Sequence, residues 1–182
     1  MAANAGAAAR GAAWERAYRQ QARGDLAVFT VLSSQGELPD CHRLHALQMA
    51  VEKLAKATFW ERNPTESPDN IVNRSHDVCE KHLYLPMREA LFPPGAAGRA
   101  QRFSAADLRD LLRQIDQLCP ANVPKGVQNT EYPWALYTDA GDELTVLAPV
   151  EVQFAVAALL DAPLGRATLK LVTRWLHDEA AG

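Results

Sequence analysis

The sequence predicts an all-α protein, and three observations support this prediction. Hydrophobic residues make up 48% of the 182 residues, and many of them are alanines, which favour helices and close helix contacts. Apolar residues recur at helical spacing in residues 41–57 and again in residues 104–118. Prolines and glycines cluster between the periodic segments. A chain of this length buries about 70% of its unfolded surface in a single domain.

The composition of the N-terminal residues predicts a flexible extension followed by a first helix. Residues 1–12 are rich in Ala and Gly and lack the sustained apolar run of a signal peptide, so we expect them to be flexible. An imperfect helical pattern predicts a helix over residues 12–33. Pro39-Asp40 then precedes a second helix that continues to about Phe59. We expect residues 13–182 to form one helical-bundle domain.

Two more helices follow a proline-containing loop at residues 63–70. Ser75 is the predicted N-cap of the third helix, which Pro86 should kink or divide. Ser104 followed by Asp107 resembles a capping box and opens a fourth helix that runs to about Leu118.

The last third of the chain is less regular. Residues 120–150 predict an irregular loop or hairpin insertion, in which residues 135–138 and 144–147 pair as short strands. Residues 150–160 and 164–178 predict two final helices. The apolar side chains of the last helix either join the core or form a dimer seam. These side chains are Leu169, Val172, Trp175 and Leu176.

One face of the second helix carries polar side chains that are unusual for a solvated surface. At about 100° per residue, five residues fall within a narrow arc: Cys41, His45, Gln48, Glu52 and Lys56. An ordinary exposed face is rich in Lys and Glu, whereas this one begins with a thiol, an imidazole and an amide. The stripe predicts a polar group that faces a groove or a partner.

Two segments of the chain resemble the HEPN superfamily of small helical bundles. The first is LHALQMAVEKLAKA at residues 44–57, and the second is Ser75-His76-Asp77. Members of this superfamily often have an apolar helix containing a Glu-Lys pair and a later helix that starts with Ser-His-Asp. The likeness covers roughly residues 12–118 and leaves the C-terminal third as an elaboration.

The resemblance implies an up-down bundle of four to five main helices, frequently dimeric. Roles in the superfamily range from RNA cleavage in toxins and defence systems to non-catalytic binding of nucleotides or partners. Its ribonuclease members use an Arg followed by a His after four to six intervening residues. Here seven residues separate Arg74 from His82, and two separate Arg174 from His177. This departure favours binding over catalysis.

We expect the ligand-binding residues to come from the second and third helices. The second helix supplies His45, Gln48, Glu52 and Lys56, and an antiparallel third helix brings His76 towards Glu52 or Lys56. Histidine and glutamate in one cleft hold a ligand, orient a water or exchange protons near neutral pH. The alternative is a buried structural network that satisfies polar groups between the helices.

A second polar group lies in the loop after the fourth helix and contains Asn129, Glu131, Tyr132 and Trp134. Such a loop supplies stacking surfaces and hydrogen bonds to a base. Alternatively, Tyr132 and Trp134 only anchor the loop to the helices. We expect Asn129, Glu131 and Trp134 to close over the first group. A contact from His45 to Glu131 or Asn129 would make the two groups one site.

Composition and spacing disfavour several other functions. The net charge of −3 gives no general attraction to nucleic acid, so RNA binding needs a local basic patch. No apolar run approaches the ~20 residues that span a bilayer. The three cysteines show no zinc-finger spacing, and no Glu-x-x-His motif occurs. We therefore expect reduced cysteines in a cytoplasmic protein with no metal site and no cofactor.

Together these observations predict a non-enzymatic, HEPN-like homodimer that binds RNA, a nucleotide or a protein partner through a polar pocket between helices. One alternative is a metal-independent ribonuclease of toxin or defence type with a rearranged active site. The other is a purely structural, antitoxin-like interaction module.

Overall fold

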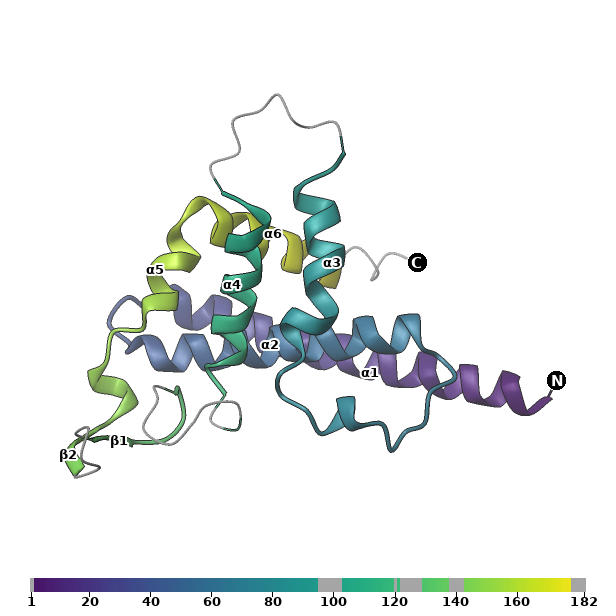
Figure 1. Ribbon diagram of the computed structural model, residues 1–182, viewed down its shortest axis with the longest axis horizontal. Helices are drawn as coiled ribbons and strands as arrows, with labels where there is room; N and C mark the ends of the chain where they lie inside the picture. Colours follow the sequence, from purple (N-terminus) through teal and green to yellow (C-terminus); the bar gives the residue numbers. More distant parts are fainter. Residues whose placement is uncertain (1, 95–102, 120, 122–128, 138–142, 178–182) are drawn as a thin grey trace.

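The computed structural model describes residues 2–94, 103–119, 121, 129–137 and 143–177 (Figure 1). Within these ranges the protein is a bundle of helices with one small hairpin, which confirms the predicted all-α class. The elements in chain order are α1 (Ala2–Ser33), α2 (Asp40–Arg62), α3 (Cys79–Leu91), α4 (Ala105–Asp116), β1 (Trp134–Tyr137), β2 (Glu143–Leu147), α5 (Ala155–Asp161) and α6 (Pro163–His177).

The two longest helices, α1 and α2, form the base of the molecule. They lie side by side along its longest axis in Figure 1 and run in opposite directions. Leu26 and Phe29 of α1 share the main hydrophobic core with Leu44 and Leu47 of α2. In Figure 1, α3 and α4 cross over this pair, while α6 packs against α1, α3 and α4. The start of α3 is thereby brought against the middle of α2, where the predicted polar stripe lies.

The first helix begins at Ala2, so the prediction of a flexible extension is wrong for residues 2–12. Alanine has the highest helix propensity of all residues, and this stretch simply continues the helix that follows it. Gly11 is buried and packs so closely on Pro64 that a Cβ atom would overlap the Pro64 carbonyl group. The N-terminal turns of α1 therefore pack against the loop that follows α2.

The N-terminus of α3 is capped from another helix. The prediction that Ser75 is the N-cap is wrong, because α3 starts at Cys79 and the residue before it, Val78, offers no capping side chain. Instead, the Asp116 carboxylate at the end of α4 accepts hydrogen bonds from the backbone N–H groups of Cys79 at 3.0 Å and Glu80 at 3.2 Å. Pro86 lies inside α3, which continues past it to Leu91.

The predicted capping box at the start of α4 is confirmed. Ser104 accepts a hydrogen bond from the backbone N–H of Asp107, and the Asp107 carboxylate accepts one from the backbone N–H of Ser104. The apolar face of α4 is buried, with Leu108 and Leu112 fully inaccessible. This local pattern fixes where α4 begins and which side it presents to the core.

The predicted hairpin is also present, because β1 and β2 pair in antiparallel orientation with Trp134 opposite Leu147. The segment between the strands, residues 138–142, lies outside the described residues. The predicted helix over residues 150–160 is shorter than expected. A 3₁₀ turn occupies Pro149–Glu151, Val152 is extended, and α5 begins only at Ala155. This break lets Phe154 enter the core.

The apolar face of α6 belongs to the core. Val172 and Leu176 are fully buried, and the partly buried Leu169 and Trp175 pack against the same cluster. Of the two alternatives for these side chains, the structure therefore shows burial in the core. Among the described residues, no helix has the length and hydropathy needed to span a membrane.

Candidate functional site

A fully buried carboxylate, that of Glu52 on α2, organises the polar side chains between α2 and the start of α3. Its Oε2 atom accepts a hydrogen bond from Gln48 Nε2 at 2.8 Å and lies 3.0 Å from Nδ1 of His76. Its Oε1 atom accepts a hydrogen bond from Lys53 at 3.0 Å and pairs with Lys56 at 2.9 Å. Both carboxylate oxygens are therefore satisfied by side chains. We call these five residues the Glu52 cluster.

The Glu52 carboxylate is held in its ionised form. Burial alone raises the pKa of a carboxyl group, but here it is outweighed by the hydrogen bond from Lys56, the charge of Lys53 and the hydrogen bond from His76, which bring the pKa of Glu52 to about 2. An ionised carboxylate only accepts hydrogen bonds, so Nδ1 of His76 carries a proton. In the neutral ring this leaves Nε2 as an acceptor. The His76 side chain is 41% exposed, so part of this ring is open to a ligand.

Lys56 is fixed from its other side by Asn73. The Lys56 ammonium lies 3.4 Å from the Asn73 carbonyl oxygen, and 5.8 Å from the centre of the Tyr18 ring. The Asn73 side-chain oxygen accepts hydrogen bonds from Tyr18 at 3.0 Å and from the Trp60 indole at 3.1 Å. Lys56 is 3% exposed, and its contacts are those of a structural anchor. This part of the cluster agrees with the alternative of a buried structural network.

Cys119, three residues beyond the end of α4, joins Glu52 and His76 in a group of three possible metal ligands. One ligand atom from each lies within 4.8 Å of the other two. However, two ammonium groups already contact the Glu52 carboxylate, and they repel a divalent cation. Burial also raises the pKa of the Cys119 thiol, which opposes the thiolate that zinc requires. The donor set fits an ion-pair network better than a metal centre.

A groove lies between the end of α1, the start of α2 and the loop at residues 130–132. Its volume is about 560 Å³, which is within the range typical of small-molecule sites. Apolar side chains of α1 form one side, and polar or aromatic side chains form the other. The lining residues are Val28, Leu32, His42, His45, Ala46, Thr130, Glu131 and Tyr132. We call this the His45 groove.

The predicted contact between His45 and Glu131 is present in the His45 groove. Nδ1 of His45 lies 3.4 Å from Oε1 of Glu131, yet this buried nitrogen makes no hydrogen bond to any residue that the structure describes. Tyr132, which also lines the groove, is 61% exposed. The groove thus offers a carboxylate acceptor, a partly exposed imidazole ring and an aromatic face.

Asn129 holds the loop that supplies Glu131 and Tyr132. Its buried side-chain oxygen accepts hydrogen bonds from the backbone N–H groups of Glu131 at 3.0 Å and Tyr132 at 2.8 Å. Thr130 donates to the Leu118 carbonyl oxygen through its hydroxyl at 3.1 Å. Asn129 therefore positions the loop instead of lining the groove. Trp134 begins β1, and its side chain lies outside the described residues.

The predicted site residues form two neighbouring groups. The expectation that His45 and His76 share one cleft is not met, because His45 lines the groove whereas His76 contacts Glu52. Cys119 lies beside the Glu52 cluster, with its thiol within 4.8 Å of ligand atoms of Glu52 and His76. The Glu52 cluster receives four of the predicted residues, namely Gln48, Glu52, Lys56 and His76.

Several residues that contribute to the Glu52 cluster or the His45 groove were not predicted from the sequence. The sequence offered a clue to two of them. Lys53 belongs to the Glu-Lys pair that carries the family resemblance, and His42 lies three residues before His45. Asn73 was not indicated by the sequence, because it ends a single 3₁₀ turn, Ile71–Asn73, which is too short to show periodicity. Cys41 shares the arc of the polar stripe but is buried in the core instead of lining either group.

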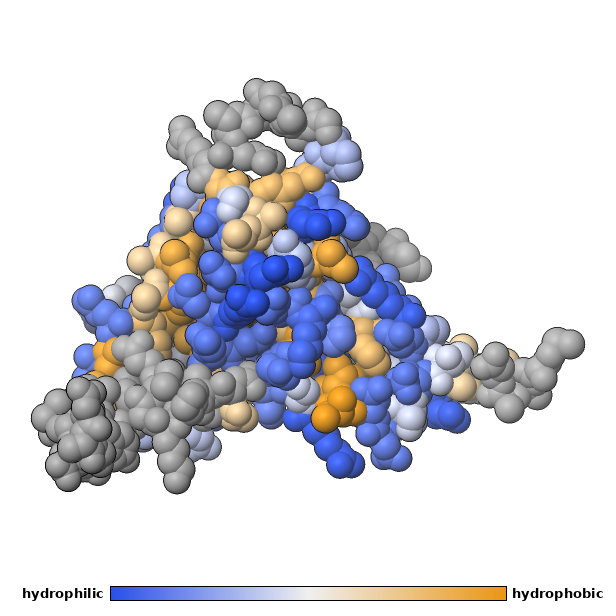
Figure 2. Space-filling model, viewed as in Figure 1, coloured by the Kyte–Doolittle hydropathy of each residue, from blue (hydrophilic) through white to orange (hydrophobic). Residues whose placement is uncertain are grey.

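The outer face of α3 and α4 is hydrophilic, as Figure 2 shows. Two of its arginines are paired with an acid: Glu80 lies 3.1 Å from Arg109 and 2.7 Å from Arg113. Lys81 likewise pairs with Asp77 at 2.9 Å. Mixed charge of this kind gives little net attraction for a phosphate backbone.

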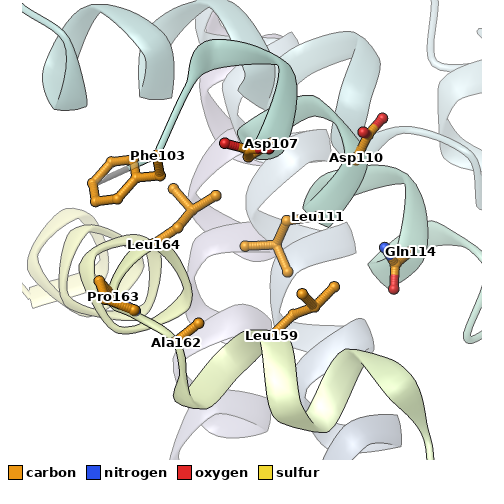
Figure 3. Close-up of a pocket in the computed structure, with 9 residues that line it drawn as sticks. All are labelled: Phe103, Asp107, Asp110, Leu111, Gln114, Leu159, Ala162, Pro163 and Leu164. Atoms are coloured by element: carbon orange, nitrogen blue, oxygen red, sulfur yellow. The ribbon is translucent and has the colours of Figure 1, made fainter. Parts of the chain in front are cut away.

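A second cavity, of about 320 Å³, lies between α4, α5 and α6 (Figure 3). Apolar side chains including Phe103, Leu111 and Leu164 line it, with Asp107 and Asp110 at its side. The Asp107 carboxylate is already engaged in the capping box of α4. This cavity offers apolar burial and little chemistry, so the His45 groove and the Glu52 cluster are the better candidates.

Comparisons with known proteins assign no family or function to the His45 groove or the Glu52 cluster. The resemblance to the HEPN superfamily therefore depends on the sequence segments around Glu52 and His76. No protein-family model, curated protein or solved structure matches this chain.

Proposed function

We propose that this chain is a HEPN-like helical bundle that binds a nucleotide, either free or within an RNA strand, in the His45 groove. The observation that carries the proposal is the contact of His45 Nδ1 with Glu131 Oε1 at 3.4 Å in the wall of the groove, beside the exposed Tyr132. The His45 and Glu131 side chains are 40% and 29% exposed, so both present polar atoms to a ligand in the groove.

A nucleobase matches the chemistry of the groove. Its flat face stacks on Tyr132, and its edge carries both donors and acceptors. Glu131 accepts from an amino or imino group of the base, while the His45 ring supplies a complementary nitrogen. The apolar side chains of α1, Val28 and Leu32, cover the other face of the ligand.

The experiment measures binding of the four common ribonucleosides by calorimetry, because a nucleoside tests the groove without any phosphate. We expect Tyr132→Ala and Glu131→Gln each to weaken binding about tenfold, which is the scale of one lost stacking or hydrogen-bonding contact. Glu89→Gln changes an exposed carboxylate on α3 and serves as the control. Equal affinities for the groove variants and the control would rule out this site.

A second candidate, a metal-independent ribonuclease, is favoured by the Glu52–His76 pair. A carboxylate that holds Nδ1 of a half-exposed imidazole is an arrangement suited to general acid–base catalysis. An RNA cleavage assay with His76→Ala and His45→Ala tests it. Cleavage that survives both substitutions would exclude these histidines as catalytic groups.

Homodimerisation, cytoplasmic localisation and binding to a protein partner stay predictions from the sequence. Light scattering of the purified protein tests the first of these directly. Co-purification of another protein, without any nucleoside binding, would favour the interaction module over the proposed function.

A further inference from the structure

The Glu52 cluster contains more positive than negative charge. One carboxylate, that of Glu52, is shared by the ammonium groups of Lys53 and Lys56, and the His76 ring lies on its other oxygen. The nearby Asp77 carboxylate does not correct the imbalance, because it accepts from Ser75 and pairs with Lys81. Lys53 and Lys56 share one negative charge, so the cluster carries a net positive charge that attracts an additional anion.

Two members of the cluster have hydrogen-bonding capacity left for such an anion. Lys56 is buried and already contacts Glu52 and Asn73. Lys53 is 15% exposed and, among the described residues, has Glu52 as its only strong acceptor, since its other contact is the Met49 sulfur at 3.9 Å. His76 uses Nδ1 for Glu52 and is 41% exposed, so its Nε2 atom remains for a ligand.

We propose that Lys53 and His76 form a phosphate-binding subsite, which makes a nucleotide, and not a nucleoside, the preferred ligand of this protein. Lys53 Nζ lies 3.0 Å from Oε1 and His76 Nδ1 lies 3.0 Å from Oε2 of the same carboxylate, so the two side chains flank one small group. The Glu52 carboxylate contacts both side chains and holds them in position. A phosphate accepts from the Lys53 ammonium and, when the ring is protonated, from Nε2–H of His76.

The position of the subsite relative to the groove fits a nucleotide. Lys53 follows His45 by eight residues on α2, which is about 12 Å along the helix axis. That separation suits a base at His45 with its phosphate chain directed towards Lys53. The identification of the ligand as a nucleotide rests on the proposed function, whereas the anion subsite itself stands on the Glu52 cluster alone.

The test measures binding of inorganic pyrophosphate by calorimetry to the full chain and to four variants. We expect Lys53→Met and His76→Gln to weaken pyrophosphate binding about tenfold or more, as loss of a charge-assisted hydrogen bond requires. Lys53→Arg keeps the charge and retains most of the affinity. Lys170→Met removes an exposed lysine of α6 and leaves binding unchanged. Circular dichroism of each variant verifies folding.

The same calorimetric titrations are repeated with three other ligands: adenosine, ADP and a short oligoribonucleotide. We expect ADP to bind more tightly than adenosine, and Lys53→Met to abolish that advantage. The oligoribonucleotide distinguishes an RNA phosphate from a free nucleotide as the source of the group. Pyrophosphate binding that is the same in Lys53→Met, Lys170→Met and the unmodified chain would overturn the subsite. Pyrophosphate binding without nucleoside binding would instead overturn the proposed function and leave the subsite intact.

Discussion

The carboxylate of Asp116 accepts a hydrogen bond from the backbone N–H of Cys79, although 37 residues separate the two along the chain. The end of α4 therefore caps the beginning of α3, three residues after His76, which contacts Glu52. Asp116 thus stabilises the start of α3 next to the candidate site.

Replacing Asp116 by Ala should destabilise the protein by about 2 kcal/mol, because it removes a cap and leaves two N–H groups of α3 without their acceptor. Urea unfolding followed by circular dichroism measures the change. Asp110→Ala, at an exposed position of the same helix, is the control and should change the free energy of unfolding little. A similar loss in both variants would contradict the capping role.

The Glu52 cluster should make stability depend on pH in acid. Folding lowers the pKa of Glu52 from its ordinary value of 4.5 to about 2, so its contribution is fully present above pH 4.5 and is lost as the pH falls towards 2. Glu52→Gln should flatten the dependence of unfolding free energy on pH in that window. Glu89→Gln, an exposed change on α3, should leave the slope as it is. An unaltered slope in Glu52→Gln would refute the ionised, buried carboxylate.

Two glycine substitutions should have opposite effects on stability. A Cβ atom at Gly165 would overlap the backbone of Leu159 and Leu160, so Gly165→Ala should cost about 2 kcal/mol or more. A Cβ atom at Gly24 meets nothing within 4 Å in the middle of α1, so Gly24→Ala should stabilise the protein by about 0.5–1 kcal/mol. Thermal unfolding of the pair checks both signs, and destabilisation by Gly24→Ala would contradict the open environment described for it.

Asn129→Ala should weaken nucleoside binding severalfold with little change in the pyrophosphate affinity. Its side-chain oxygen holds the backbone of Glu131 and Tyr132, so its loss loosens the loop that lines the His45 groove while the Glu52 cluster keeps its contacts. Parallel calorimetric titrations with both ligands measure the difference. If the two affinities fell together, Asn129 would act through the whole fold and not through the loop.

Local patterns were predictable from the sequence, and distant pairings mostly were not. Ser104 and Asp107 lie three residues apart, so the start of α4 could be predicted from their spacing alone. The cap supplied by Asp116 could not, because it joins segments whose proximity only the fold decides. The composition of residues 2–12 was interpreted as a flexible tail, although the same alanines extend α1.

In the candidate site, too, a contact between neighbouring segments was predictable and a more distant arrangement was not. The approach of His76 to Glu52 followed from consecutive helices and is present in the structure. The separation of His45 from that pair was not predictable, because it depends on how the loop at residues 129–132 lies on α2. The sequence supplied the residue types, and the crossing of the helices determined how they are grouped.

The three thiols provide built-in reporters of how this protein opens. Cys41, Cys79 and Cys119 are buried and form no disulfide, and they lie near the start of α2, at the start of α3 and just beyond the end of α4. An alkylating reagent reaches each of them only after the surrounding helix junction has separated. The order in which mass spectrometry finds the three labelled therefore reveals which junction yields first, without any mutation.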